Sequence, residues 1–207
     1  MTTDDIDAPQ ALTVTWTVVL HHCYPGVQNG CHIHLDAASG TGTTGSFVAA
    51  NHGDDSYYEI RATAHDTMGA TTTVVREIHP AKVTMTLASD PPGVALALDS
   101  ETVTTPFTWQ AIPGGSHTVT APATAVFDGI TFGFDAWTSG SGERTQAFST
   151  PQTASTMTVR YLPPLAALTL GGNVPGATVL VDGSPVTLPA TVSVRVGQHT
   201  LAPATQR

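Results

Sequence analysis

Two cysteines, Cys23 and Cys31, constrain the fold of this chain more than any other feature. Turn-forming residues fill the segment 24–30 between them, and runs typical of β-strands lie on either side. A disulfide between these cysteines would join the two arms of one antiparallel hairpin. The numbering runs in opposite directions along the two arms, so the bond predicts the register of the neighbouring pairs.

In this register, three histidines are predicted to lie close together on the hairpin. His22 faces His32 and Leu20 faces His34, and because side chains alternate between the faces of a strand, one face carries all three imidazoles. A disulfide that closes so short a loop stabilises the folded state by about 2 to 3 kcal/mol on the chain-entropy argument. We favour a structural bond over a redox pair, because the spacing is unlike C-x-x-C.

The three histidines are candidate ligands for Zn(II) or Cu(II), since imidazole suits both ions. His52 or Asp36 would be a fourth donor if the fold brings it near. We prefer the simpler interpretation, in which the histidines are polar, half-exposed residues hydrogen-bonded to backbone and solvent. On that interpretation the chain has no cofactor, and Zn or Cu is the alternative.

Composition limits the class of protein and its partners. The 207 residues are 41% apolar and include 19 Gly and 15 Pro, which favours many short strands in two or three small domains. Sixteen acidic residues against seven basic ones leave no basic stripe for nucleic acid. Low charge and two cysteines across one hairpin indicate an oxidising, extracellular or cell-surface location.

The beginning of the chain bears on export. Residues 1–5 lack the basic start and apolar run of a signal peptide, and no apolar stretch is long enough for a membrane span. We therefore expect that export is encoded upstream, or that the chain is an excerpt of a longer protein.

Alternating runs and turn signals divide the chain into three modules. Alternation is clearest over 58–66, followed by a reversal into 71–78, as in the last hairpin of an immunoglobulin-like sandwich. Prolines near 80 and at 163–164 mark boundaries. The predicted fold is all-β, with tandem small β-sandwich modules over 1–80, 81–163 and 164–207.

An internal repeat links the second and third modules. Each copy has a strand after Pro-Gly, a tight turn at an aspartate, a proline edge and a second strand. His117 and His199 recur in this frame, so we assign them no chemistry. Residues Pro92, Gly93, Asp99, Thr104, Pro106 and Thr108 recur, with constant spacing, at Pro175, Gly176, Asp182, Thr187, Pro189 and Thr191.

The repeat-bearing modules resemble known surface modules. Segments 89–108, 115–122 and 134–138 resemble bacterial surface repeats of the divergent internalin B-repeat type, and 174–200 is similar to a PEGA-type module. The sequence departs from the B-repeat pattern after Trp137, where Thr-Ser-Gly replaces an aspartate-bearing loop. A ligand role for that loop is not carried over.

The first module carries a second resemblance. Segments 19–23, 31–34 and 46–52 are similar to the polycystic-kidney-disease-like sandwiches that follow the propeller in bacterial glucose/sorbosone dehydrogenases, and the likeness extends over 12–161. It implies an oxidoreductase parent whose quinone-dependent sugar oxidation belongs to an upstream propeller. No propeller blade matches within this chain.

Catalytic signatures are missing from the sequence, which contains no nucleophile elbow, zinc-protease helix, phosphate loop or dinucleotide turn. Core packing is the default for the tryptophans. Alternatively, Trp137, Trp109 or Tyr57 would stack on a sugar ring of a polysaccharide or cell-surface glycan.

These observations predict a non-catalytic accessory region of a secreted bacterial protein, acting in spacing, surface attachment or carbohydrate contact. One alternative is a part of a quinone-dependent sugar dehydrogenase, with the upstream catalytic domain as its partner. Others are a stand-alone cell-surface adhesin and, least favoured, a metal-dependent enzyme built on the three histidines.

Overall fold

The regular secondary structure of the described part of the chain consists of β-strands joined by turns and loops. The structure, a computed structural model, describes residues 12–23 and 31–204, and its elements are all β-strands, which confirms the all-β class. The start of the chain and the turn expected over 24–30 lie outside the described residues. Within the described ranges, no helix is long and apolar enough to cross a membrane.

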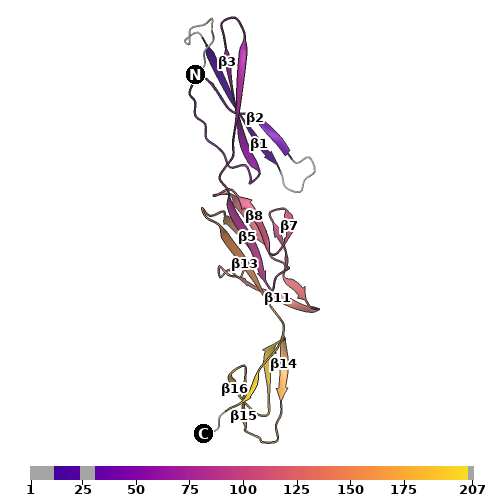
Figure 1. Cartoon of the computed structure of the whole chain (residues 1–207). Coiled ribbons are helices and arrows are strands. Elements are labelled where there is room, and N and C mark those ends of the chain that lie inside the picture. The colour runs from indigo at the N-terminus through magenta and orange to yellow at the C-terminus, as the bar shows by residue number, and fades with distance from the viewer. Residues whose placement is uncertain (1–11, 24–30, 205–207) are drawn as a thin grey trace.

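The sheets form three groups that follow one another along the chain. We call them the first module (13–78), the second module (83–162) and the third module (165–203). Figure 1 shows the first and third modules at opposite ends of the second, so the molecule is elongated. Short segments, 79–82 and 163–164, connect the modules.

The first module contains one antiparallel four-stranded sheet in the order β2-β1-β3-β4. Its register places Cys23 opposite Cys31, His22 opposite His32 and Leu20 opposite His34, as the sequence predicts. The strands are β1 (Thr13–Cys23), β2 (Cys31–Thr41), β3 (Ser56–His65) and β4 (Thr71–Ile78).

One face of this sheet is covered by the loop 42–55. Val18 and Leu20 of β1 and Tyr58 of β3 are buried there, because alternation places them on the same face. Phe47 from the loop packs against Tyr58, with ring centroids 5.3 Å apart. Among the described residues, the loop thus takes the place that a second sheet has in an immunoglobulin sandwich.

Trp16 shows how closely the loop approaches the sheet. A Cβ atom added at Gly40 of β2 would lie 2.4 Å from the indole ring, and one added at Gly45 of the loop would lie 2.2 Å from it. Both positions therefore require glycine, and the indole lies between two lengths of bare backbone. Trp16 is a packing residue, as its default assignment predicts.

The second module is a two-layer sandwich. One sheet has five strands in the order β10-β11-β13-β5-β8 and the other has four in the order β12-β9-β6-β7. The β5–β13 pair is parallel. The strands are β5 (Val83–Asp90), β6 (Ala95–Leu98), β7 (Glu101–Thr104), β8 (Phe107–Ala111), β9 (Ser116–Thr120), β10 (Thr124–Phe127), β11 (Ile130–Trp137), β12 (Thr145–Ser149) and β13 (Ser155–Leu162).

The main core of the described chain lies between these two sheets. Leu87 and Val159 from one sheet and Leu96 and Val119 from the other are fully buried against one another. Trp137 joins them at 2% exposure. Such burial removes most of the apolar surface of these side chains from water, which stabilises the folded module.

The third module has fewer strands and a smaller buried core than the second. It has a two-stranded sheet, β14-β17, and a three-stranded sheet, β16-β15-β18. Val181 is its one buried hydrophobic side chain among the described residues. The strands are β14 (Leu165–Leu170), β15 (Thr178–Val181), β16 (Ser184–Thr187), β17 (Ala190–Arg195) and β18 (Leu201–Pro203).

The repeat predicted from the sequence has one structural basis in both copies. Asp99 and Asp182 take left-handed backbone conformations, with φ of 53° and 49°. The Asp99 carboxylate accepts a hydrogen bond from His117 Nδ1 at 2.8 Å, and that of Asp182 accepts one from His199 Nδ1 at 2.6 Å. The recurring histidines therefore brace a turn, in agreement with the repeat frame.

Candidate functional site

The three histidines expected to share a face lie together at one end of the first module's sheet. His22 of β1 and His32 and His34 of β2 each place a ligand nitrogen so that these atoms all lie within 4.8 Å of one another. His22 is buried at 2% exposure, whereas the other two are exposed. The cluster therefore has an inner and an outer side.

The position of the cluster follows from the strand pattern. His22 continues the buried face of β1 that carries Val18 and Leu20, and alternation points all three side chains to the same side. At the end of the strand, apolar residues give way to imidazoles. The cluster is thus the polar continuation of the first module's core.

A fourth histidine reaches the cluster from the loop 42–55. The ring centroid of His52 lies 4.3 Å from that of His22 and 4.8 Å from that of His34. Asp36, the other fourth donor considered from the sequence, lies where the β1–β2 register shifts and is not in the grouped ligand set. The loop therefore supplies the additional imidazole.

The electrostatics of the cluster favour neutral imidazole at its centre. Burial lowers the pKa of His22 first, and the neighbouring charges of His32, His52 and His34 lower it further. The Nε2 atoms of His22 and His34 lie 3.0 Å apart, so one ring donates a hydrogen bond to the lone pair of the other. Neutral imidazoles with convergent nitrogens are the form that binds transition metals.

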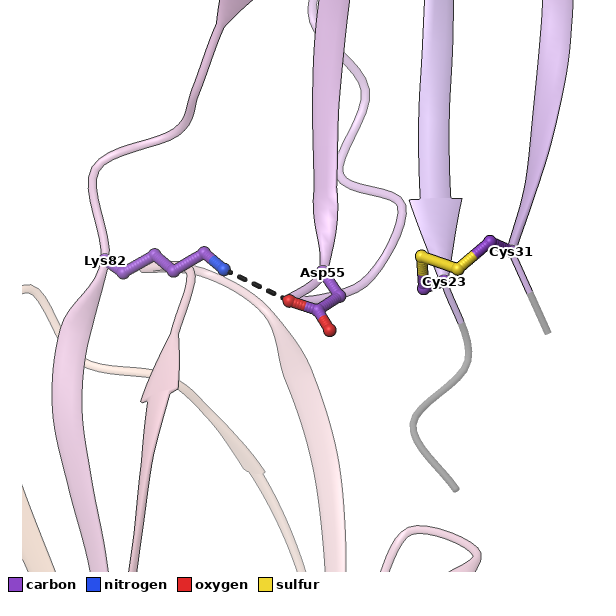
Figure 2. The surroundings of a disulfide bond; sticks show 4 residues. All are labelled: Cys23, Cys31, Asp55 and Lys82. Carbon is purple, nitrogen blue, oxygen red and sulfur yellow. Dashed lines mark hydrogen bonds and ion pairs between the residues drawn. A yellow bond between two sulfur atoms is a disulfide. The ribbon is translucent and has the colours of Figure 1, made fainter. Parts of the chain in front are cut away.

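The disulfide lies directly beside the histidines. Cys23 and Cys31 are bonded in the structure, which confirms the expected pairing. Figure 2 shows this bond next to the loop that carries Asp55, whose carboxylate lies 3.5 Å from Nζ of Lys82, the last residue of the segment that connects the first two modules. Because both cysteines are oxidised, the cluster offers nitrogen donors without a thiolate.

A contact between the modules lies two residues beyond His52. The Asp54 carboxylate accepts a hydrogen bond from Trp109 Nε1 at 3.2 Å and another from the backbone N–H of Ile112 at 2.7 Å. His117 Nε2 lies 3.4 Å from the same carboxylate. The bonds of Asp54 to the second module were not predicted from the sequence, because an acidic residue in a glycine-containing loop is typical of a solvated turn.

A cleft of about 590 Å³ opens at this junction. Trp109, Phe107 and Val103 of the second module form much of its apolar lining, and His52 and Asp54 line it from the first module. The cleft therefore brings together an aromatic surface, a carboxylate and one histidine of the cluster.

The candidate sugar-stacking residues differ in their surroundings. Trp137 is wrong for this role, because at 2% exposure both faces of its ring are inside the core. Tyr57 is stacked between His21, at 4.6 Å, and His79, at 4.8 Å, so its faces are covered too. Trp109 is half-buried and lines the junction cleft.

Comparison of the chain with protein-family models, curated proteins and solved structures found no match. The fold defines a structural class, a tandem array of small all-β modules with a disulfide-pinned first sheet. The family resemblances of the modules are expectations from sequence segments.

Proposed function

We propose that the chain is a non-catalytic accessory region of an extracellular protein, which spaces neighbouring parts of that protein and contacts carbohydrate. The observation that carries the proposal is the end-to-end order of the modules (Figure 1). The first two modules are joined at a junction by specific hydrogen bonds. An array of this kind separates what lies at its two ends.

The junction between the first two modules supports a stiff spacer. The connecting segment 79–82 is short, and Asp54 bonds to Trp109 Nε1 and to the Ile112 backbone. The backbone N–H of Cys23 donates to the Asp55 carbonyl at 3.1 Å, which holds this loop to the disulfide. The loop 42–55 thus connects the Cys23–Cys31 disulfide to the contact between the first two modules.

Carbohydrate contact is favoured by the junction cleft. Sugar rings bind where an aromatic face lies beside polar groups that hydrogen-bond hydroxyls. Trp109 lines the cleft, and the acidic side chains of Asp55, Asp99 and Glu101 are among its other lining residues. Trp109 is therefore the aromatic residue through which the accessory role would act.

The extracellular location is supported by the disulfide, since such bonds persist in oxidising compartments. The resemblance of the first two modules to regions that follow a sugar dehydrogenase propeller makes a catalytic domain of the same polypeptide the partner of this region. An adhesin is the second candidate for the parent protein, because tandem surface-type modules occupy the C-terminal part of the chain.

Small-angle X-ray scattering of the full chain tests the spacer. A compact chain of 207 residues would have a radius of gyration of about 17 Å. We expect a value well above this, with a distance distribution that extends along one axis. A value near the compact limit would contradict the end-to-end array.

Retention on insoluble polysaccharides tests carbohydrate contact, with cellulose, chitin and cell-wall peptidoglycan as probes. We expect Trp109→Ala to abolish retention and Tyr57→Ala to leave it unchanged, because the Tyr57 ring is already covered. Far-UV circular dichroism checks that both variants fold. Equal retention by wild type and Trp109→Ala would refute the role of the cleft.

A further inference from the structure

We propose that His22, His32, His34 and His52 form a binding site for one divalent transition-metal ion, with imidazole nitrogens as the protein ligands and Cu(II) or Zn(II) as the ion. Metal binding is a different function from the spacer role, although the loop that carries His52 also forms the contact between the first two modules. It requires no catalytic step.

The distances suit a metal ion after small side-chain rotations. Ligand nitrogens around a tetrahedral Zn(II) lie roughly 3.3 Å apart, given Zn–N bonds of about 2.0 Å. In the cluster, the His22 and His34 Nε2 atoms are 3.0 Å apart, and the nitrogens of the three strand histidines are all within 4.8 Å. His52 contacts this group through its ring and completes the set by turning toward it.

The backbone that carries the ligands is held from two directions. The Cys23–Cys31 bond locks the pair of strands one residue from His22 and His32, which fixes the separation of those two ligands. The loop ligand is held as well, because Tyr58 Oη donates to the carbonyl of Ala50 at 2.9 Å. The site is therefore preorganised by covalent and hydrogen-bonded supports.

The same loop is held on its other side as well. Asp54 is bonded to the second module at Trp109 and Ile112, and Ser56 Oγ donates to the Gly53 carbonyl at 2.8 Å. The position of His52 is thus set between a sheet of its own module and the next module. We assign Asp54 a positioning role for this ligand.

The surroundings of the cluster differ from those of the other histidines. Elsewhere in the described chain, single histidines lie beside carboxylates: Glu59 lies 3.6 Å from His21, and the recurring histidines bond to the turn aspartates. In the cluster, imidazoles lie edge-to-face and stacked on one another, with centroids 3.7 Å apart for His22 and His32 and 5.1 Å apart for His22 and His34. A cation placed among these rings would be bound by several imidazole nitrogens at once.

The donor set selects the ion. Imidazole without thiolate or carboxylate suits Cu(II) and Zn(II) better than Ca(II) or Mg(II), which prefer oxygen. For a fixed nitrogen site, Cu(II) binds more tightly than Zn(II). His32 and His34 are exposed, so an ion reaches the inner nitrogen of His22 from solvent without unfolding of the sheet.

Isothermal titration calorimetry of the full, metal-stripped chain with Cu(II) and, separately, Zn(II) tests the site. We expect one ion per chain. His32→Ala, His34→Ala and His52→Ala should each weaken binding by roughly tenfold or more, since loss of even an outer-shell partner has an effect of that size. His65→Ala is the matched control, because His65 bonds to Thr15 Oγ1 at the other end of the same sheet.

Two further measurements distinguish a specific site from weak association with the surface. Electron paramagnetic resonance of the Cu(II) complex should show coupling to several nitrogens, and His32→Ala should reduce their number. Zn(II) should raise the melting temperature of wild type and of His65→Ala but not that of the three ligand variants. The three tested ligands are exposed, so these variants are expected to fold. Absence of saturable binding by both ions, or equal binding by wild type and His32→Ala, would overturn the proposal.

Discussion

The indole Nε1 of Trp109 in the second module donates a hydrogen bond to the carboxylate of Asp54 in the first module, at 3.2 Å. Asp54 lies two residues after His52, which contacts the histidine cluster. A single loop thus joins the histidine cluster to the module junction. The conformation of that loop affects both.

Asp54→Ala should loosen the junction. The substitution removes the acceptor for Trp109 Nε1 and for the Ile112 N–H, and leaving such half-buried donors without a partner costs about 1 to 3 kcal/mol each. We expect a broader distance distribution in small-angle scattering and weaker metal binding, with the melting temperature of the second module's core unchanged.

Asp55→Ala is the control for that substitution. Its carboxylate is exposed and lies 3.5 Å from Lys82 Nζ, an ion pair of the kind that contributes at most about 1 kcal/mol. The scattering curve of this variant should match that of wild type. Similar loosening in both variants would show that general loop charge, and not the Trp109 contact, holds the junction.

The disulfide should stabilise the first module by about 2 to 3 kcal/mol. Cys23→Ser/Cys31→Ser lacks the link between β1 and β2, so more chain entropy is lost on folding. Hydrogen exchange followed by mass spectrometry should show reduced protection in β1 to β4 and unchanged protection in the second module. Reductant should lower protection in wild type to the level of the double variant and leave the variant itself unaffected.

The core of the second module gives a stability prediction. Leu87 is completely buried, so Leu87→Ala removes buried methyl groups and leaves a cavity, at a cost of about 2 to 5 kcal/mol. Urea denaturation followed by tryptophan fluorescence measures this loss, since Trp137 lies in the same core. Val126→Ala, at a side chain that is 67% exposed, should change stability little.

The Asp182–His199 pair makes the third module sensitive to pH. Hydrogen bonds from the Thr200 N–H and from His199 lower the pKa of Asp182, so its contribution to stability is present above its ordinary value of 3.8 and is lost as pH falls through the lowered pKa. Bonding to Asp182 and to the Arg195 carbonyl raises the pKa of His199, so its contribution is present below 6.5 and is lost as pH rises through the raised pKa.

Stability of the third module should therefore be highest between about pH 4 and pH 6.5. Urea titrations followed by NMR signals of β15 and β18 measure it across this range. Asp182→Asn keeps a residue that tolerates the left-handed turn and removes the charge. The stability of the variant's third module should therefore depend little on pH, at both the acidic and the basic end of this range. An unchanged pH profile in the variant would contradict the assignment, and signals from the second module serve as the internal control.

Several features of the fold and of the candidate site could be predicted from local pattern. Strand side chains alternate with a period of two and the disulfide sets the pairing, so the register of His22 with His32 and the shared face with His34 follow from numbering alone. The repeat was detectable for a similar reason, since a left-handed turn restricts the residue types at Asp99 and Asp182.

Contacts made by loops could not be predicted from local sequence pattern. The segment 42–55 has no strand period, so nothing in its order of residues shows which sheet it covers or that Asp54 bonds to Trp109. The tryptophans show the same limit. Trp137 and Trp109 both end or occupy strands of one module, yet one lies in the core and the other lines the cleft.

The all-β class, the disulfide hairpin, the three-histidine face and the repeated turn follow from the order of the amino acids, because each depends on neighbours in the chain or on one covalent bond. Three other features are visible only in the folded chain: His52 joins the cluster, Asp54 bonds across the first junction and Trp109 borders a cleft. These depend on packing between segments far apart in sequence, where the free energy of burial and of specific hydrogen bonds selects one arrangement that no local period encodes.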